Sequence, residues 1–107
     1  MSLVPHTAVL LRWPDPLPAF SGDELDALQE RHLAYLAKLR ESGALLASGP
    51  FDHQPDQRWR GLSIFAVGLE EAGRVMANDP SVRAGRLEPV VFTWVVPEGL
   101  IAFPGPR

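Results

Sequence analysis

One histidine stands within the apolar repeat of a long helical segment, where an ionisable side chain is unusual. His32 shares a helix face with residues spaced three and four apart, which are Leu25, Leu28, Tyr35 or Leu36, and Leu39. Its imidazole is therefore expected to face a sheet rather than solvent. Histidine titrates near neutral pH, so His32 is a candidate general acid or base. The alternative is a core histidine whose ring nitrogens find partners within the protein.

Asp79 precedes a proline, and this pair has a structural use of its own. Aspartate is a good helix N-cap and proline suits the first helical position. The sequence therefore predicts one helical turn from Pro80 to Ala84, capped by Asp79 and closed by Gly85. Capping alone would account for the aspartate, and the residues around it leave a second role open.

Two further groups of residues are candidates for substrate binding. Ser48, Gly49 and Pro50 end a short apolar run, where a glycine lets a ligand approach the backbone and a serine offers a hydroxyl. The plainer interpretation is a strand terminator. Arg60, beside Arg58 and Trp59, could bind an anionic or aromatic ligand through charge and stacking. The alternative there is a solvated loop with one anchoring tryptophan.

Composition excludes several classes of function. The chain has no cysteine, so disulfides and thiolate chemistry are ruled out, and its three histidines match no metal-binding spacing. A net charge of −3 without a dense basic cluster argues against nucleic acid. There is no phosphate-cradling glycine loop, and no apolar run approaches the length of about 18 residues that a membrane span needs. We therefore expect a cytoplasmic protein without metal, cofactor, nucleic-acid partner or membrane contact.

The order of predicted elements indicates an α+β fold. Residues 1–107 are expected to form one domain with its core at about 7–96 and a proline-rich tail over 97–107. Ser21 with Glu24 is typical of a capping box, and Gly43 of a left-handed helix end. Strands are expected over 7–13, 44–48, 61–67 and 87–96, helices over 22–42 and 69–78, and a loop over 51–60. This β-α-β-β-α-β order is the ferredoxin-like pattern, a four-stranded antiparallel sheet with both helices on one face.

The expected strands are apolar on both faces, although two helices cover only one. In the last strand Val90, Phe92 and Trp94 point one way, while Val91 and Val95 point the other. A large exposed apolar patch usually marks an interface. The simplest cover is a second copy of the sheet, so the sequence predicts a homodimer.

Several segments together resemble the YciI-like (YCII-related) family. They are His32 to Leu36 with Gly43, Ala47 to Phe51, Gly61, Glu70 to Ala72, Asn78 to Pro80 with Gly85, and Trp94. The resemblance implies a ferredoxin-like fold of the dimeric α/β barrel superfamily. It also implies an active site built around His32 and Asp79, in which the carboxylate orients the imidazole. Ser81, where the family often has an aromatic residue, and the loop over 52–59 depart from the family pattern at the expected pocket mouth.

Three functional hypotheses follow. The first is a cofactor-independent enzyme that uses His32 and Asp79 in acid–base chemistry on a small aromatic or enolisable molecule, such as an isomerase, a lyase or a dehydrochlorinase like one relative of the family. The second is a non-catalytic module that binds a small ligand in the same pocket. The third is a structural dimer in which His32 is only a core residue.

Overall fold

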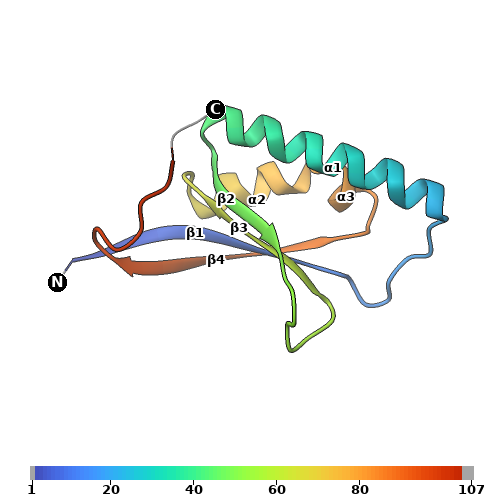
Figure 1. Cartoon of the computed structure of the whole chain (residues 1–107), viewed down its shortest axis with the longest axis horizontal. Coiled ribbons are helices and arrows are strands. Elements are labelled where there is room, and N and C mark those ends of the chain that lie inside the picture. Colours follow the sequence, from blue (N-terminus) through green and yellow to red (C-terminus); the bar gives the residue numbers. More distant parts are fainter. Residues whose placement is uncertain (1, 105–107) are drawn as a thin grey trace.

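The computed structural model describes residues 2–104 of the chain. Its elements follow the predicted order, and the helical turn predicted after Asp79 forms a short third helix (Figure 1). They are β1 (Leu3–Arg12), α1 (Gly22–Ser42), β2 (Leu45–Pro50), β3 (Trp59–Phe65), α2 (Leu69–Ala77), α3 (Pro80–Arg83) and β4 (Glu88–Pro97). Within the described residues no helix combines the length and apolar character that crossing a bilayer requires.

Helix α1 begins and ends at the residues that its sequence signals predict. The Ser21 side chain accepts from the Glu24 backbone N–H, and the Glu24 carboxylate accepts from the Ser21 backbone N–H. These two bonds satisfy N–H groups that a helix start leaves without partners. At the other end Gly43 has a φ of 85° and its N–H bonds to the Arg40 carbonyl, the left-handed stop that favours glycine.

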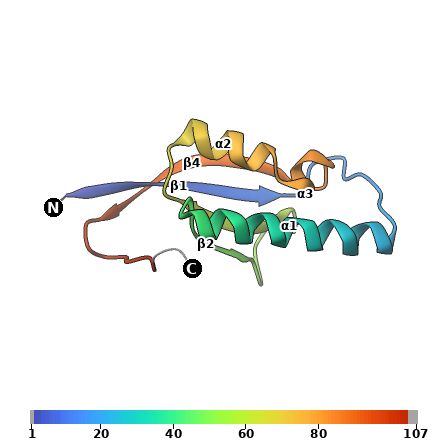
Figure 2. The same ribbon diagram turned by 90° about the horizontal axis from the view of Figure 1, so that it is seen from above.

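The four strands form one antiparallel sheet in the order β2-β3-β1-β4. Helices α1 and α2 run alongside each other over the same face, as Figure 2 shows from above. This arrangement is the ferredoxin-like fold, and the predicted α+β class is confirmed.

The two faces of the sheet differ in what covers them. On the helix side Val9, Leu11 and Phe65 pack with Ala72 and Met76 of α2, and all five are buried. On the other face Phe92 and Trp94 are each 42% exposed. Val96, farther along the same face of β4, is buried, so the open apolar part of this face is centred on Phe92 and Trp94.

The predicted ends of the two hairpin strands were wrong. β2 continues through Gly49 to Pro50, and β3 begins at Trp59, so the loop is shorter than expected. Pro50 is tolerated because β2 is an edge strand, where a missing N–H costs no ladder bond. Trp59 and Arg60 therefore lie in a strand and are half-buried, so the solvated-loop interpretation of this pair was also wrong.

The ends of the chain extend the sheet beyond its predicted length. β1 starts at Leu3 instead of Thr7, because its first residues pair with the end of β4, Leu3 opposite Pro97. The predicted tail begins inside β4 and then turns back, so that the Phe103 ring meets His6 edge-on at 5.5 Å. The last three residues of that tail lie outside the described residues.

Candidate functional site

His32 and Asp79, which lie 47 residues apart in sequence, contact each other in the space between α1 and α3. The His32 Nδ1 atom is 2.6 Å from the Asp79 Oδ2 atom. Asp79 is fully buried and His32 is only 8% exposed. A short contact between an imidazole and a carboxylate at such burial is a strong, charge-assisted hydrogen bond.

Asp79 uses its two carboxylate oxygens for two different partners. It is the N-cap of α3, and its Oδ1 accepts from the Ser81 backbone N–H at 2.8 Å. Its Oδ2 faces the imidazole. An ionised carboxylate only accepts hydrogen bonds, so the proton of a neutral His32 ring is expected on Nδ1. The other ring nitrogen, Nε2, then carries the lone pair and can take up a proton.

His32 lines a pocket of about 380 Å³ that opens between α1 and the β2–β3 hairpin. The polar lining side chains are Gln29, His32, Ser48, Arg60, Ser63, Ser81 and Arg86. The apolar part of the wall is made by Leu11, Leu33, Leu36, Pro50, Leu62 and Leu87. A pocket of this size and mixed lining is typical of sites for small molecules.

The structure brings every sequence-predicted site residue to this pocket or to its wall. Ser48, Gly49 and Pro50 line it as exposed residues, whereas Arg60 is half-buried. Asp79 reaches it only through His32.

The other two histidines lie elsewhere. His6 packs near Trp94 and Phe103, and the His53 side chain is 93% exposed. Within residues 2–104 no three His, Cys, Asp or Glu side chains are gathered where they could hold a metal ion.

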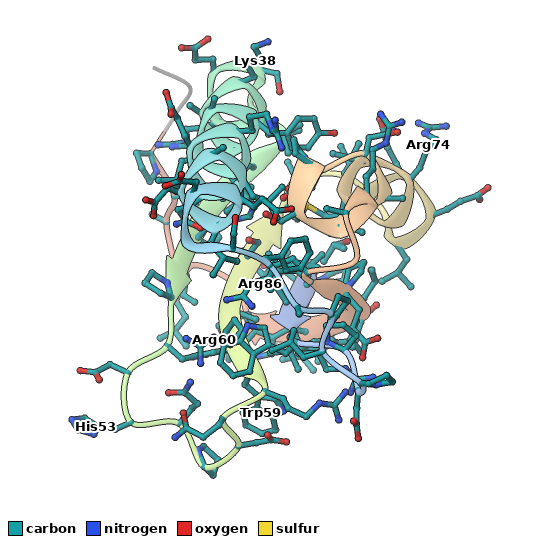
Figure 3. All side chains as sticks on the ribbon, turned by 90° about the vertical axis from the view of Figure 1, so that its right-hand side faces the viewer. Lys38, His53, Trp59, Arg60, Arg74 and Arg86 are labelled. Atoms are coloured by element: carbon teal, nitrogen blue, oxygen red, sulfur yellow. The ribbon has the colours of Figure 1, made fainter. Side chains whose placement is uncertain are left out.

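Trp13 supports the mouth of the pocket. The Arg60 guanidinium carbon lies 4.1 Å from the centre of its ring, and that of Arg86 lies 5.2 Å away. Figure 3 labels these two arginines next to each other, near the hairpin loop. Cations over an indole ring are held by its electron-rich face.

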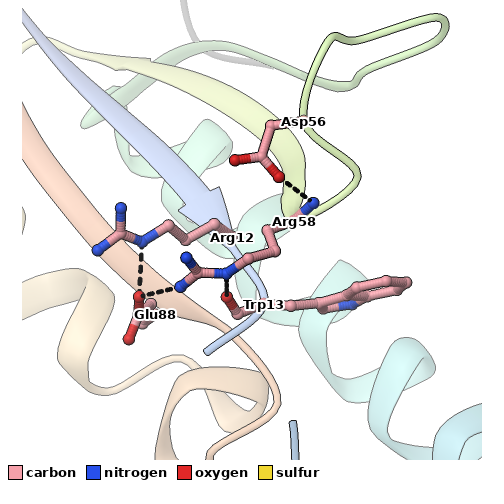
Figure 4. Close-up of polar contacts among 5 residues, drawn as sticks. All are labelled: Arg12, Trp13, Asp56, Arg58 and Glu88. Carbon is pink, nitrogen blue, oxygen red and sulfur yellow. Dashed lines mark hydrogen bonds and ion pairs between the residues drawn. The ribbon is translucent and has the colours of Figure 1, made fainter. Parts of the chain in front are cut away.

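Arg58 in turn holds Trp13 in place (Figure 4). The Trp13 N–H donates to the Arg58 carbonyl at 2.8 Å, and the Arg58 Nε donates to the Trp13 carbonyl at 3.0 Å. Glu88 accepts from both Arg58 and Arg12. The ion cluster therefore ties the end of β1, the segment before β3 and the start of β4 together.

Arg86 and Trp13 are site residues that the sequence did not reveal. After α3, Gly85 adopts a φ of 79°, and the Arg86 N–H then donates to the Ser81 carbonyl at 2.9 Å. The same turn thus presents Asp79 to His32 and Arg86 to the pocket. A single arginine before a strand is not a distinctive signal, so only the folded turn identifies it.

Tyr35 adds a second polar group beside Asp79. Its hydroxyl donates to the Val75 carbonyl at 2.6 Å. Burial raises the pKa of Tyr35, and the negative charge of Asp79 raises it further. The phenol is therefore kept neutral and bridges α1 and α2.

The profile of the YCII-related domain matches residues 8–94, most of the chain and all of the pocket-forming elements. The chain belongs to the YCII-related family. No curated protein sequence matches it significantly.

Among solved structures, this YCII-related protein is similar to 5-chloro-2-hydroxyhydroquinone dehydrochlorinase (TftG) from Burkholderia phenoliruptrix AC1100, in complex with 2,5-dihydroxybenzoquinone. The two are 19% identical with a TM-score of 0.51, over 82% of this chain and 92% of the other. At this identity the likeness shows a shared fold.

Proposed function

We propose that the protein is a cofactor-independent enzyme that carries out acid–base chemistry on a small aromatic or enolisable molecule. The observation that carries this proposal is the His32 ring, which lines a pocket while its Nδ1 is held by a buried carboxylate. Holding one nitrogen leaves the other in a defined protonation state toward the pocket, as general base catalysis requires.

The proposed reaction begins with proton transfer. His32 Nε2 takes a proton from an acidic carbon or hydroxyl of the substrate, and the electron pair left behind forms an enolate or quinonoid bond. Asp79 stabilises the imidazolium ion that results. The ring then returns the proton to another atom, which gives isomerisation, or a leaving group departs with its electron pair, which gives elimination.

The structural neighbour supports this choice of substrate class. TftG is a dehydrochlorinase of a hydroxylated ring and was solved with a dihydroxybenzoquinone. Elimination of chloride from such a ring needs a base and no redox cofactor. We propose a related substrate class for this chain, with the serines and arginines of the pocket deciding which ring it accepts.

Hydrogen–deuterium exchange tests the proposal without knowledge of the net reaction. The protein is incubated in D₂O with a panel of enolisable ketones and halogenated hydroquinones, and loss of substrate protons is followed by NMR. We expect exchange or chloride release with at least one compound, and a loss of about a hundredfold or more in His32→Ala.

His53→Ala is the matched control, because this histidine is exposed and contributes nothing to the pocket. If compounds bind but neither exchange nor release occurs, the enzyme proposal fails and the protein is a ligand-binding module of the same pocket.

We also propose that the protein is a homodimer through the open face of the sheet. The support is the exposure of Phe92 and Trp94 on the face of the sheet opposite the helices. Sedimentation at micromolar concentration is expected to give twice the mass of 11.8 kDa, and Trp94→Lys to give the monomer. A wild-type protein that sediments only as a monomer at these concentrations would contradict the proposal.

A further inference from the structure

Two arginines face the pocket without an acidic partner. Arg60 and Arg86 both line it, and no aspartate or glutamate is among the described residues of the lining. Within residues 2–104 neither guanidinium lies within ion-pair distance of a carboxylate. Arg60 donates to the Gln57 carbonyl, at 3.0 Å.

Three other arginines of the chain do have acidic partners. Arg12 and Arg58 share Glu88, and Arg74 contacts Glu71. The pairs with Glu88 join β1 and the segment before β3 to β4, and the pair between Arg74 and Glu71 lies on the surface. Arg60 and Arg86 instead lie near the same Trp13 ring, at 4.1 and 5.2 Å from its centre, so two positive charges are gathered at one end of one pocket.

Because both guanidinium carbons lie close to one ring centre, they are at most about 9 Å apart, which is comparable to a Debye length of about 8 Å in physiological salt. The two positive charges therefore repel each other. The Trp13 ring attracts both cations but carries no net charge to offset them. An anion seated between the guanidinium groups would offset this repulsion. A guanidinium also presents its N–H donors in a planar fork that matches a carboxylate.

The pocket has further donors for such a ligand. Ser63 and Ser81 are almost fully buried and line it. His32 lies in the same lining, so a ring held at the arginines could extend toward its Nε2 atom.

We infer that the pocket binds a small organic anion, a carboxylate on a single ring, with the carboxylate between Arg60 and Arg86. This inference rests on the proposed function in one respect, which is that the same pocket holds the substrate. It adds that the substrate carries a negative charge, and that Arg86 and Trp13 determine specificity for it.

Calorimetry with salicylate and salicylamide tests the inference on the full chain. The two probes have the same ring and nearly the same shape, but only salicylate carries the carboxylate. We expect salicylate to bind at least about tenfold more tightly than the amide, the ratio that a free-energy difference of about 1.4 kcal/mol produces. The advantage is expected to shrink as the salt concentration rises.

Variants assign the effect to the two arginines. Arg60→Gln and Arg86→Gln are each expected to weaken salicylate binding about tenfold and to leave salicylamide unchanged. Arg83→Gln is the matched control, because Arg83 is exposed on α3 and does not line the pocket. Arg60→Lys and Arg86→Lys keep the charge and lose the fork, so they are expected to lie between wild type and glutamine.

Three results would overturn the inference: equal binding of the two probes, salicylate binding that survives both glutamine substitutions, or tight binding of inorganic phosphate with no binding of salicylate. None of them bears on proton transfer by His32, which the exchange experiment measures separately. Anion binding without exchange would leave the inference standing and remove the proposed function.

Discussion

Two helices of this protein start from the same kind of cap, but the caps lie in different environments. Ser21 begins α1 at the surface, with an extended backbone at ψ 164°, and bonds only to residues of its own first turn. Asp79 begins α3 with a similar backbone at ψ 131°, and it is fully buried.

Burial explains why only the second cap acquires a second role. An exposed side-chain oxygen can bond water with any lone pair that the helix does not use. A buried carboxylate cannot bond to bulk water, so its second oxygen needs a hydrogen-bond donor from the protein. His32 supplies that donor. The same local motif is therefore a helix start in one place and half of a candidate catalytic pair in the other.

The largest expected difference between the caps is in stability. Asp79→Ala removes a cap and also leaves the buried Nδ1–H of His32 without an acceptor, so we expect a loss of about 2–4 kcal/mol in the free energy of unfolding. Ser21→Ala removes a cap alone and is expected to cost about 1 kcal/mol. Urea unfolding of both variants measures the difference. Equal losses would mean that the contact with His32 contributes nothing to folding.

Asp79→Asn separates capping from chemistry at the buried site. Asparagine is nearly as good an N-cap, so stability is expected to change by about 1 kcal/mol or less. Its amide can accept from or donate to the imidazole, so the single tautomer of His32 should become a mixture. The nitrogen chemical shifts of the His32 ring report this, and proton exchange on the substrate should fall about a hundredfold. A ring that keeps one tautomer in the variant would show that the carboxylate does not determine it.

Tyr35 is a neighbour of the buried cap residue, Asp79, and its phenol is neutral. Burial, and then the charge of Asp79, raise the pKa of Tyr35 above its ordinary value of 10.0. Above that pH the unfolded chain loses the phenolic proton first, so the free energy of unfolding should fall as pH rises toward the folded-state pKa.

Tyr35→Phe should flatten that fall, at a cost of about 1 kcal/mol for the lost bond to Val75. This is the only tyrosine of the chain, so tyrosinate absorbance follows its titration directly. A phenol that ionises at its ordinary pKa in the folded protein would contradict the expectation.

The smallest effect belongs to the exposed cap. The Ser21 backbone N–H, and then the Ser21 side chain, lower the pKa of Glu24 from its ordinary value of 4.5. The stabilisation is present above that value and is lost as pH falls through the folded-state pKa, because the unfolded chain binds the proton first.

Glu24→Gln should remove this acid dependence and leave the behaviour at neutral pH almost unchanged. Thermal unfolding at pH 3 to 7 compares the variant with wild type, and an unaltered acid profile would mean that the capping box is not formed in solution.

Local signals were sufficient wherever the structure depends on a few neighbouring residues. The bounds of α1, its capping box, its glycine stop and the cap of α3 were all predicted from spacing and residue type, because each is formed within one or two turns. The element order followed, and with it the ferredoxin-like fold. The apolar stripe of α1 placed His32 toward the interior for the same reason.

Only the tertiary structure decided what depends on distant segments. The ends of β2 and β3 are set by strand pairing, which lets Pro50 and Trp59 join a ladder that their local sequence argued against. The pairing of His32 with Asp79 requires α3 to lie against α1, and the residues alone left it open beside plain capping.

Three separate segments supply Trp13, Arg60 and Arg86. The sheet pairs β1 with β3, which brings Trp13 next to Arg60, and the turn after α3 brings Arg86 to the same ring. The sequence by itself thus determined the elements and the residue types able to do chemistry. Their grouping into one pocket was decided by packing, because contacts between distant segments leave no periodic or local trace in the chain.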